Sequence, residues 1–91
     1  MAKILAIMDV MPENVELNLD ELKEKVKKEI ESFGAEFGEV KEEEVAFGLK
    51  RLKFVIISDE DKGGFDPLEE NVRKIDGVKS AEIVDVRRAI G

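Results

Sequence analysis

Residues 50–58 read KRLKFVIIS and residues 3–11 read KILAIMDVM. The first stretch holds a continuous run of β-favouring residues at positions 54–57. In the second, apolar side chains alternate on both sides of a predicted strand that Pro12 ends. Because strands that are apolar on both faces occur inside a sheet rather than at its edge, we expect these two strands to be central.

A helix is predicted between these two strands. Apolar residues follow Asn18 at spacings of three or four, namely Leu19, Leu22, Val26, Ile30 and Phe33. Glu21 stands three residues after Asn18, as in a capping box, and Gly34 can adopt the left-handed conformation that ends many helices. Residues 35–44 alternate weakly, with Glu39 and the acidic run 42–44, which predicts an edge strand protected by charge.

The second half of the chain repeats this order. Residues 45–49, VAFGL, connect the edge strand to strand 50–58, and a polar loop with glycines follows at 59–64. Asp66 is the predicted cap of a second helix, with Pro67 in its first turn and Glu69 completing a capping box. Its buried stripe would be Leu68, Val72 and Ile75, with Gly77 at its end. The last strand would span 78–88, with apolar positions Val78, Ala81, Ile83, Val84 and Val86.

The order strand, helix, strand, strand, helix, strand is the split βαβ pattern. We therefore predict an α+β protein with a ferredoxin-like βαββαβ plait, in which residues 1–91 form one domain. Right-handed crossovers would place both helices on one face of a four-stranded antiparallel sheet. The side chains expected to face the helices are Ile4, Ala6, Met8, Val10, Leu52, Phe54 and Ile56.

The opposite face of this sheet would have no helix over it. It would carry Leu5, Ile7, Val55 and Ile57, with Phe47 and Leu49 near its rim. Uncovered apolar area of this kind usually marks a contact surface.

Composition restricts the chemistry. The chain has 91 residues, 43% apolar and 41% charged, which suits one folded core. Its net charge of −7 disfavours nucleic acid and anionic lipid as partners. Without Cys or His there is no thiolate, no imidazole base and no ordinary zinc ligand set, so we expect no catalytic residue, metal or cofactor. The apolar run at residues 1–8 is too short to span a membrane, and a cytoplasmic protein is predicted.

Three local patterns fail as ligand sites. The acids of residues 59–61 lack the spacing of an EF-hand, and Gly63 with Gly64 lacks the Lys-Ser/Thr of a phosphate loop. Strand 50–58 offers one Phe and no second aromatic for stacking RNA bases. The basic residues Lys50, Arg51 and Lys53 remain available for an acidic patch on a protein.

Two features are less easily assigned. Phe47 stands between Ala46 and Gly48, and it either folds back into the core or remains exposed for a partner. Arg87 and Arg88 either keep a strand end soluble or meet an anionic partner.

The chain resembles the archaeal elongation factor 1-beta family over essentially its whole length. The most specific motif is residues 45–52, VAFGLKRL, and the loop at 59–62, the segment 68–70 and the ending 84–88 also fit. The resemblance implies an exchange domain that binds elongation factor 1-alpha, a GTPase, and promotes GDP release. It places the exchange aromatic at Phe47 and the C-terminal basic residue at Arg88 or its neighbour Arg87. The remaining partner-binding residues would come from the same motif, namely Ala46, Gly48, Lys50 and Arg51.

An exchange factor needs no bond chemistry, because it acts by binding the loosened or nucleotide-free GTPase more tightly than the GDP-bound form. We expect such a protein to be monomeric alone. The alternative is a regulatory or ligand-binding plait that forms a homodimer through the open sheet face. A third reading, an acylphosphatase-like enzyme, lacks the Asn and Arg around an anion-binding loop that it needs.

Overall fold

The computed structural model describes residues 2–89. Its elements, in chain order, are β1 (Lys3–Pro12), α1 (Leu19–Phe33), β2 (Glu36–Ala46), β3 (Leu49–Asp59), the short 3₁₀ turn η1 (Glu60–Lys62), α2 (Asp66–Arg73) and β4 (Val78–Ala89). None of the helices in this part of the chain has the length and hydropathy needed to cross a membrane.

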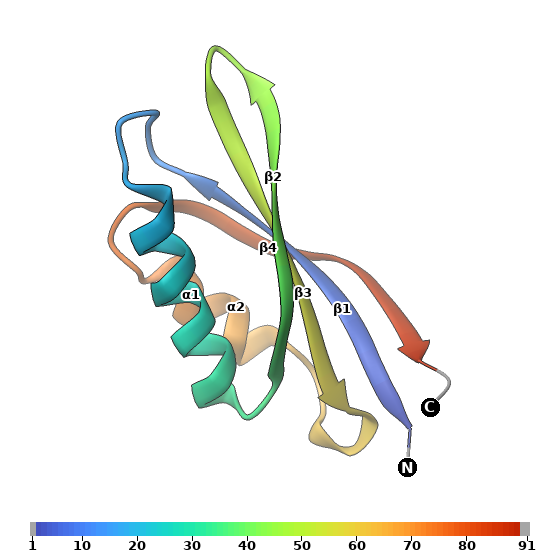
Figure 1. The fold of residues 1–91 in the computed structure, drawn as a ribbon. Helices are drawn as coiled ribbons and strands as arrows, with labels where there is room; N and C mark the ends of the chain where they lie inside the picture. Colours follow the sequence, from blue (N-terminus) through green and yellow to red (C-terminus); the bar gives the residue numbers. More distant parts are fainter. Residues whose placement is uncertain (1, 90–91) are drawn as a thin grey trace.

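The strands form one antiparallel sheet in the order β2-β3-β1-β4, and both helices lie on one side of it (Figure 1). This confirms the predicted ferredoxin-like α+β plait, with β1 and β3 at its centre. The sheet is strongly twisted, and the hairpin of β2 and β3 extends beyond the helices at one end (Figure 1).

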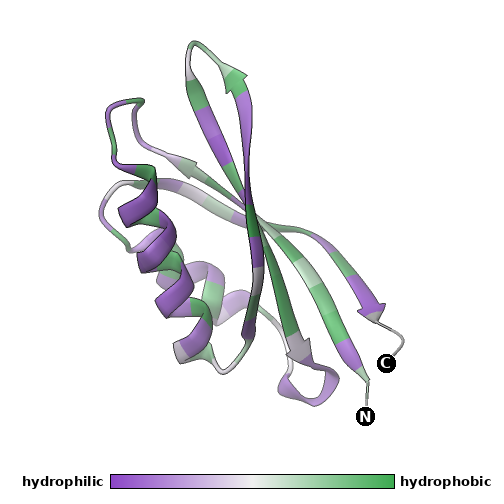
Figure 2. Ribbon diagram, in the orientation of Figure 1, coloured by the Kyte–Doolittle hydropathy of each residue, from purple (hydrophilic) through white to green (hydrophobic). Residues whose placement is uncertain are grey.

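The core lies between the helices and the sheet. The predicted sheet residues Ala6, Met8, Val10, Leu52, Phe54 and Ile56 are all fully buried there, whereas Ile4 is only partly buried at the margin. Leu22, Val26 and Ile30 of α1 pack onto them, which confirms the helical periodicity. Figure 2 shows the contrast between the apolar central strands and the largely polar outer surface of α1.

The ends of α1 follow from local side-chain chemistry. The Asn18 side chain accepts a hydrogen bond from the Glu21 N–H at 3.2 Å, and Gly34 has φ of 97°, as both signals predicted.

The start of α2 differs from the prediction. Asp66 lies inside the helix, the N-cap position is Phe65, and no side chain caps it. The ring of Phe65 is buried 5.9 Å from that of Phe33, so tertiary packing fixes this helix start. Glu69 does not complete a capping box either, because its carboxylate accepts the Ile83 N–H of β4 at 2.6 Å. The helix also ends earlier than predicted, at Arg73.

The hairpin of β2 and β3 is tighter than predicted. The expected connection at 45–49 is reduced to Phe47 and Gly48, because Val45 and Ala46 belong to β2 and Leu49 to β3. Ala46 pairs directly with Leu49 across this two-residue turn.

Two of the apolar positions predicted for the last strand are exposed. Val84 and Val86 lie on β4, which is an edge strand, and their side chains are about half accessible to solvent. The register of β4 against β1 shifts between Asp85 and Ile83, so Val84 lies in a β-bulge without a partner on β1.

On the face of the sheet opposite the helices, the apolar side chains are partly covered by neighbouring charged side chains. Leu5, Ile7, Val55 and Ile57 are neither buried nor fully exposed. Long charged side chains from the neighbouring strands occupy the same face, so the apolar patch is smaller than the sequence suggested.

Candidate functional site

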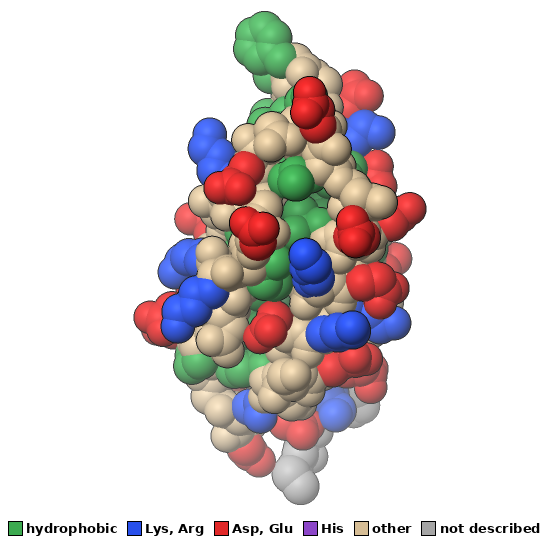
Figure 3. All heavy atoms as spheres, turned by 90° about the vertical axis from the view of Figure 1, so that its left-hand side faces the viewer, with side chains coloured by type: hydrophobic (Ala, Val, Ile, Leu, Met, Phe, Trp, Pro, Cys, Tyr) green, Lys and Arg blue, Asp and Glu red, His purple; other side chains and the backbone are tan. Residues whose placement is uncertain are grey.

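The tip of the hairpin presents Phe47 to solvent. Its side chain is 100% exposed, so the alternative in which it folds into the core is wrong. Figure 3 shows an apolar group projecting from this end of the molecule, past a surface of mixed charge.

The backbone at this tip is strained. Phe47 has φ of 53° and Gly48 has φ of 78°, so both turn residues are left-handed, and Phe47 is the one non-glycine residue with positive φ within residues 2–89. Such turns favour Asn-Gly, and a bulky aromatic in the left-handed region costs about 1–2 kcal/mol. A strained and fully exposed aromatic contributes nothing to folding, and this combination is typical of a functional residue.

Two further apolar side chains extend the hairpin surface, and neither was predicted from the sequence as a site residue. Val15, in the loop between β1 and α1, and Val45, on β2, are both exposed. Beside them lies a pocket of about 280 Å³ whose apolar lining is Pro12, Val15, Leu17, Leu19 and Gly48. Only the tertiary structure reveals this pocket, because it brings residues 12–19 against the start of β3.

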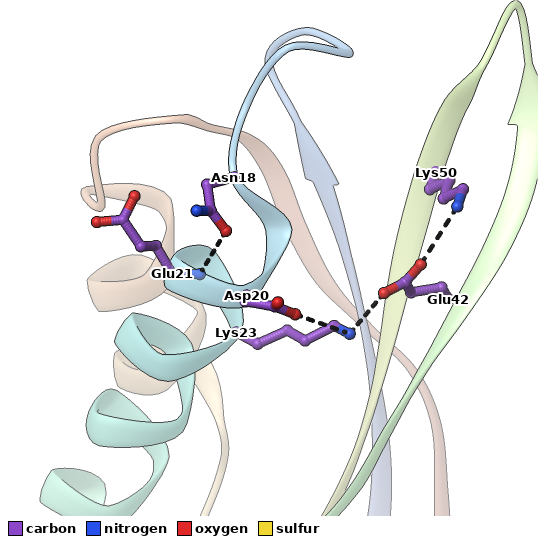
Figure 4. A network of polar contacts seen from close by, with 6 residues as sticks. All are labelled: Asn18, Asp20, Glu21, Lys23, Glu42 and Lys50. Atoms are coloured by element: carbon purple, nitrogen blue, oxygen red, sulfur yellow. Dashed lines mark hydrogen bonds and ion pairs between the residues drawn. The ribbon is translucent and has the colours of Figure 1, made fainter.

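Ion pairs attach the base of the hairpin to the rest of the fold. Lys23 of α1 lies 2.5 Å from Glu42 of β2, and Glu42 also lies 3.5 Å from Lys50 of β3 (Figure 4). The hydrogen bond and charge of Lys23, followed by those of Lys50, lower the pKa of Glu42. The hairpin is therefore braced against α1 on the helix side of the sheet.

A second group of charges braces the open face. Arg51 donates to Glu43 across the hairpin, and Asp9 of β1 lies 3.7 Å from Arg51 Nε and 3.1 Å from Lys53 Nζ. The hydrogen bond from Arg51 lowers the pKa of Glu43, and the same contact raises the pKa of Arg51. Lys50 and Arg51 are thus engaged within the fold, whereas Ala46 and Gly48 shape the turn that carries Phe47.

The two arginines lie near the end of β4. Arg87 is paired in register with Leu5 and Arg88 with Ile4, so their side chains leave opposite faces of the sheet. Arg87 Nε lies 2.9 Å from Asp85, and Arg88 Nη2 lies 2.9 Å from both carboxylate oxygens of Glu60. Both guanidinium groups remain largely exposed.

The structure does not bring the aromatic and the arginines together. The end of β4 pairs with the start of β1, which pairs with the end of β3, whereas Phe47 precedes the start of β3. With about 3.3 Å per strand residue, Phe47 and Arg88 lie on the order of 30 Å apart along a molecule whose longest extent is 42 Å. They can contact one partner only at two separate places (Figure 1).

The acidic loop after β3 shows no ligand geometry. Across residues 2–89, no three acidic side chains gather in a way that could hold a metal ion. In this loop, Asp59 instead pairs with Lys3 at 3.0 Å and Glu60 with Arg88.

The fold and the exposed aromatic tip together are typical of a small protein-binding domain with a ferredoxin-like architecture. The fold alone resembles that of a de novo designed protein, Foldit4, with a TM-score of 0.60 and 17% identity over 98% of each chain. The sequence is more specific, because residues 5–89 match the EF-1 guanine nucleotide exchange domain. The chain belongs to this family, and its function is guanine nucleotide exchange in translation elongation.

Curated relatives named elongation factor 1-beta match along nearly the full chain. The protein of Methanosarcina barkeri is 41% identical over 97% of this chain and 99% of its own length. That of Staphylothermus marinus is 39% identical, covering 97% and 98%, and that of Pyrococcus abyssi is 40% identical, covering 93% of each. Most such relatives are archaeal, which confirms the resemblance drawn from residues 45–52.

Proposed function

We propose that this chain, as a cytoplasmic monomer, binds the GTPase elongation factor 1-alpha at two separate places and thereby releases GDP and allows GTP to load. The hairpin end, with Phe47, would anchor the partner. The β4 end, with Arg88, would disturb its nucleotide site. The observation that carries this proposal is the complete exposure of Phe47 on a strained turn.

Phe47 can supply binding energy without loss of contacts inside the fold. The ring loses no packing when it leaves solvent, because it contacts no core residue, and an aromatic ring that fills a pocket is a common binding hot spot. The adjoining pocket beside Val15 can receive an apolar side chain in return. Ala46 and Gly48 leave the ring unobstructed because both are small.

Arg88 supplies charge. A guanidinium placed within a few ångströms of the GTPase magnesium ion repels it, and loss of the ion weakens nucleotide binding. Arg87 lies beside it and leaves the opposite face of the sheet. The family resemblance makes Arg88 the proposed exchange residue. Arg87 would lie beside it at the interface.

The mechanism is differential binding without bond chemistry. If the factor lowers nucleotide affinity, the nucleotide lowers the affinity of the factor by the same ratio. A thousandfold acceleration of GDP release, carried by dissociation, corresponds to about 4 kcal/mol of coupling. One anchored ring and one cation near the magnesium ion are sufficient for an effect of this size.

The direct test is release of a fluorescent GDP analogue from elongation factor 1-alpha, with and without this chain. Phe47→Ala and Arg88→Ala should each lower exchange efficiency by about tenfold or more. Lys28→Ala, which removes an exposed cation from the middle of α1, is the matched control and should exchange normally. Absence of acceleration by the unmodified chain would refute the proposed partner, and full activity of either variant would remove that residue from the mechanism.

The monomer proposal has its own test. The apolar residues of the open sheet face are half-covered by charged neighbours, which favours a monomer over a dimer through that face. Light scattering should give a mass near 10.2 kDa. A tight homodimer without affinity for the GTPase would instead support the regulatory plait.

A further inference from the structure

The contact between Arg88 and Glu60 joins two distant parts of the chain. Arg88 lies near the end of β4, and Glu60 lies in η1, directly after β3. Arg88 Nη2 is 2.9 Å from each carboxylate oxygen of Glu60, so the carboxylate receives the guanidinium through both oxygens. The Glu60 N–H donates to the Ala2 carbonyl at 3.0 Å, which ties the turn that carries this carboxylate to the start of the chain.

This ion pair opposes the charge that Arg88 would bring to a partner. A carboxylate in contact with a guanidinium cancels most of its field, because the two opposite charges act together at longer range. If the pair stayed together near a magnesium ion, the Glu60 carboxylate would attract the ion while the Arg88 guanidinium repels it. Arg88 can therefore act on a magnesium and phosphate site only after it has left Glu60.

We propose that Glu60 is a positioning residue that holds Arg88 in a neutralised position until the partner docks. The inference rests on the proposed function of Arg88. The pair is exposed, with side-chain accessibilities of 70% for Arg88 and 42% for Glu60, so it is easily reversible. Glu60 thus prevents Arg88 from binding other anions. When the chain docks on elongation factor 1-alpha, Arg88 leaves Glu60 and contacts the GTPase instead.

The size of the effect follows from the strength of exposed ion pairs. Such a pair holds its arginine by up to about 1 kcal/mol, which corresponds to about fivefold in population. The apparent affinity for a partner is reduced by the fraction of molecules in which the arginine is available. Removing the carboxylate should therefore tighten binding by about two- to fivefold.

The test titrates Glu60→Gln against elongation factor 1-alpha loaded with a fluorescent GDP analogue. The concentration giving half-maximal release should fall about two- to fivefold, and the maximal rate should stay unchanged because Arg88 is already released in the docked complex. Asp61→Asn is the matched control, since it removes one negative charge from the same 3₁₀ turn without touching the pair. It should leave the half-maximal concentration within error of the unmodified chain.

A double-variant comparison separates this inference from the proposed function. Glu60→Gln should change nothing when combined with Arg88→Ala, because the carboxylate acts only through the arginine. If Arg88→Ala slows exchange but Glu60→Gln does not lower the half-maximal concentration, the holding role is overturned and the function of Arg88 stands. The holding role is also overturned if Asp61→Asn lowers the half-maximal concentration equally, or if Glu60→Gln lowers it in the Arg88→Ala background. If Arg88→Ala exchanges normally, both ideas fail.

Discussion

At the scale of one residue, the proposed role of Phe47 opposes stability. Its left-handed backbone suits Asn better than Phe, and its ring gains no burial in return. We expect Phe47→Asn to raise the free energy of unfolding by about 1 kcal/mol and to lower exchange severely. Chemical denaturation and GDP release on the same sample measure the two effects.

Gly48→Ala is the control for this prediction. Gly48 has φ of 78°, and a Cβ there would meet nothing closer than the Val15 side chain at 3.9 Å, so the substitution adds backbone strain without a clash. It should destabilise the hairpin by about 1 kcal/mol. If Phe47→Asn also lowered the free energy of unfolding, the prediction that Phe47 strains the turn and destabilises the fold would be wrong.

Glu69 belongs to α2 but secures β4. Its side chain is only 15% exposed, and the carboxylate accepts the Ile83 N–H at 2.6 Å, next to the strand bulge. Glu69→Ala should lower the free energy of unfolding by about 1–3 kcal/mol, because it leaves that N–H without its acceptor. Denaturant unfolding measures the loss. Glu70→Ala, on the exposed side of the same helix, should change stability little, and an equal loss in both variants would contradict this account.

The contact between Arg51 and Glu43 in the hairpin predicts that the stability of the fold depends on pH. Hydrogen bonding to Arg51 lowers the pKa of Glu43 in the folded state, so this contact stabilises the fold above the ordinary carboxyl pKa near 4.5. The stabilisation is lost as pH falls through the lowered pKa. Glu43→Gln should therefore melt earlier than the unmodified protein at pH 7, and the difference should vanish in acid. Thermal melting from pH 7 to pH 3 tests this.

The partner residue supplies the control for the pH experiment. In an Arg51→Gln background, Glu43 has lost the contact that lowers its pKa. The change in melting temperature caused by Glu43→Gln should then be the same at neutral and at acid pH. A pH-dependent difference that persists there would assign the effect to another neighbour of Glu43.

The two proposed contact residues lie at opposite ends of the molecule. Phe47 and Arg88 lie on the order of 30 Å apart, so they share no contact through which to couple. We expect the losses of exchange free energy in Phe47→Ala and Arg88→Ala to add within about 0.5 kcal/mol in the double variant. Measured exchange efficiencies of the four proteins test this. A double variant no worse than either single one would mean that both ends serve one cooperative step.

The signals that predicted the fold correctly were local. The apolar spacing from Leu22 to Ile30, the Asn18 cap and the Gly34 terminus all act within a few residues. The apolar residues on both faces of 3–11 and the continuous β-favouring run in 50–58 identified the central strands. The cap at Asp66 failed because the packing of Phe65 on Phe33, 32 residues earlier in the sequence, positions that helix start instead. The exposure of Val84 could not be predicted, because a list of apolar positions does not reveal that β4 is an edge strand with a bulge at this residue.

The sequence by itself determined the type and order of the elements, the burial of the central strands and, through its motif, the family. Interactions between neighbouring residues encode these properties. Only the tertiary structure decided that Phe47 is exposed, that Arg88 lies at the far end of the sheet, and that Arg88 pairs with Glu60. These facts depend on strand register and on packing between segments far apart in the chain, which no local pattern specifies.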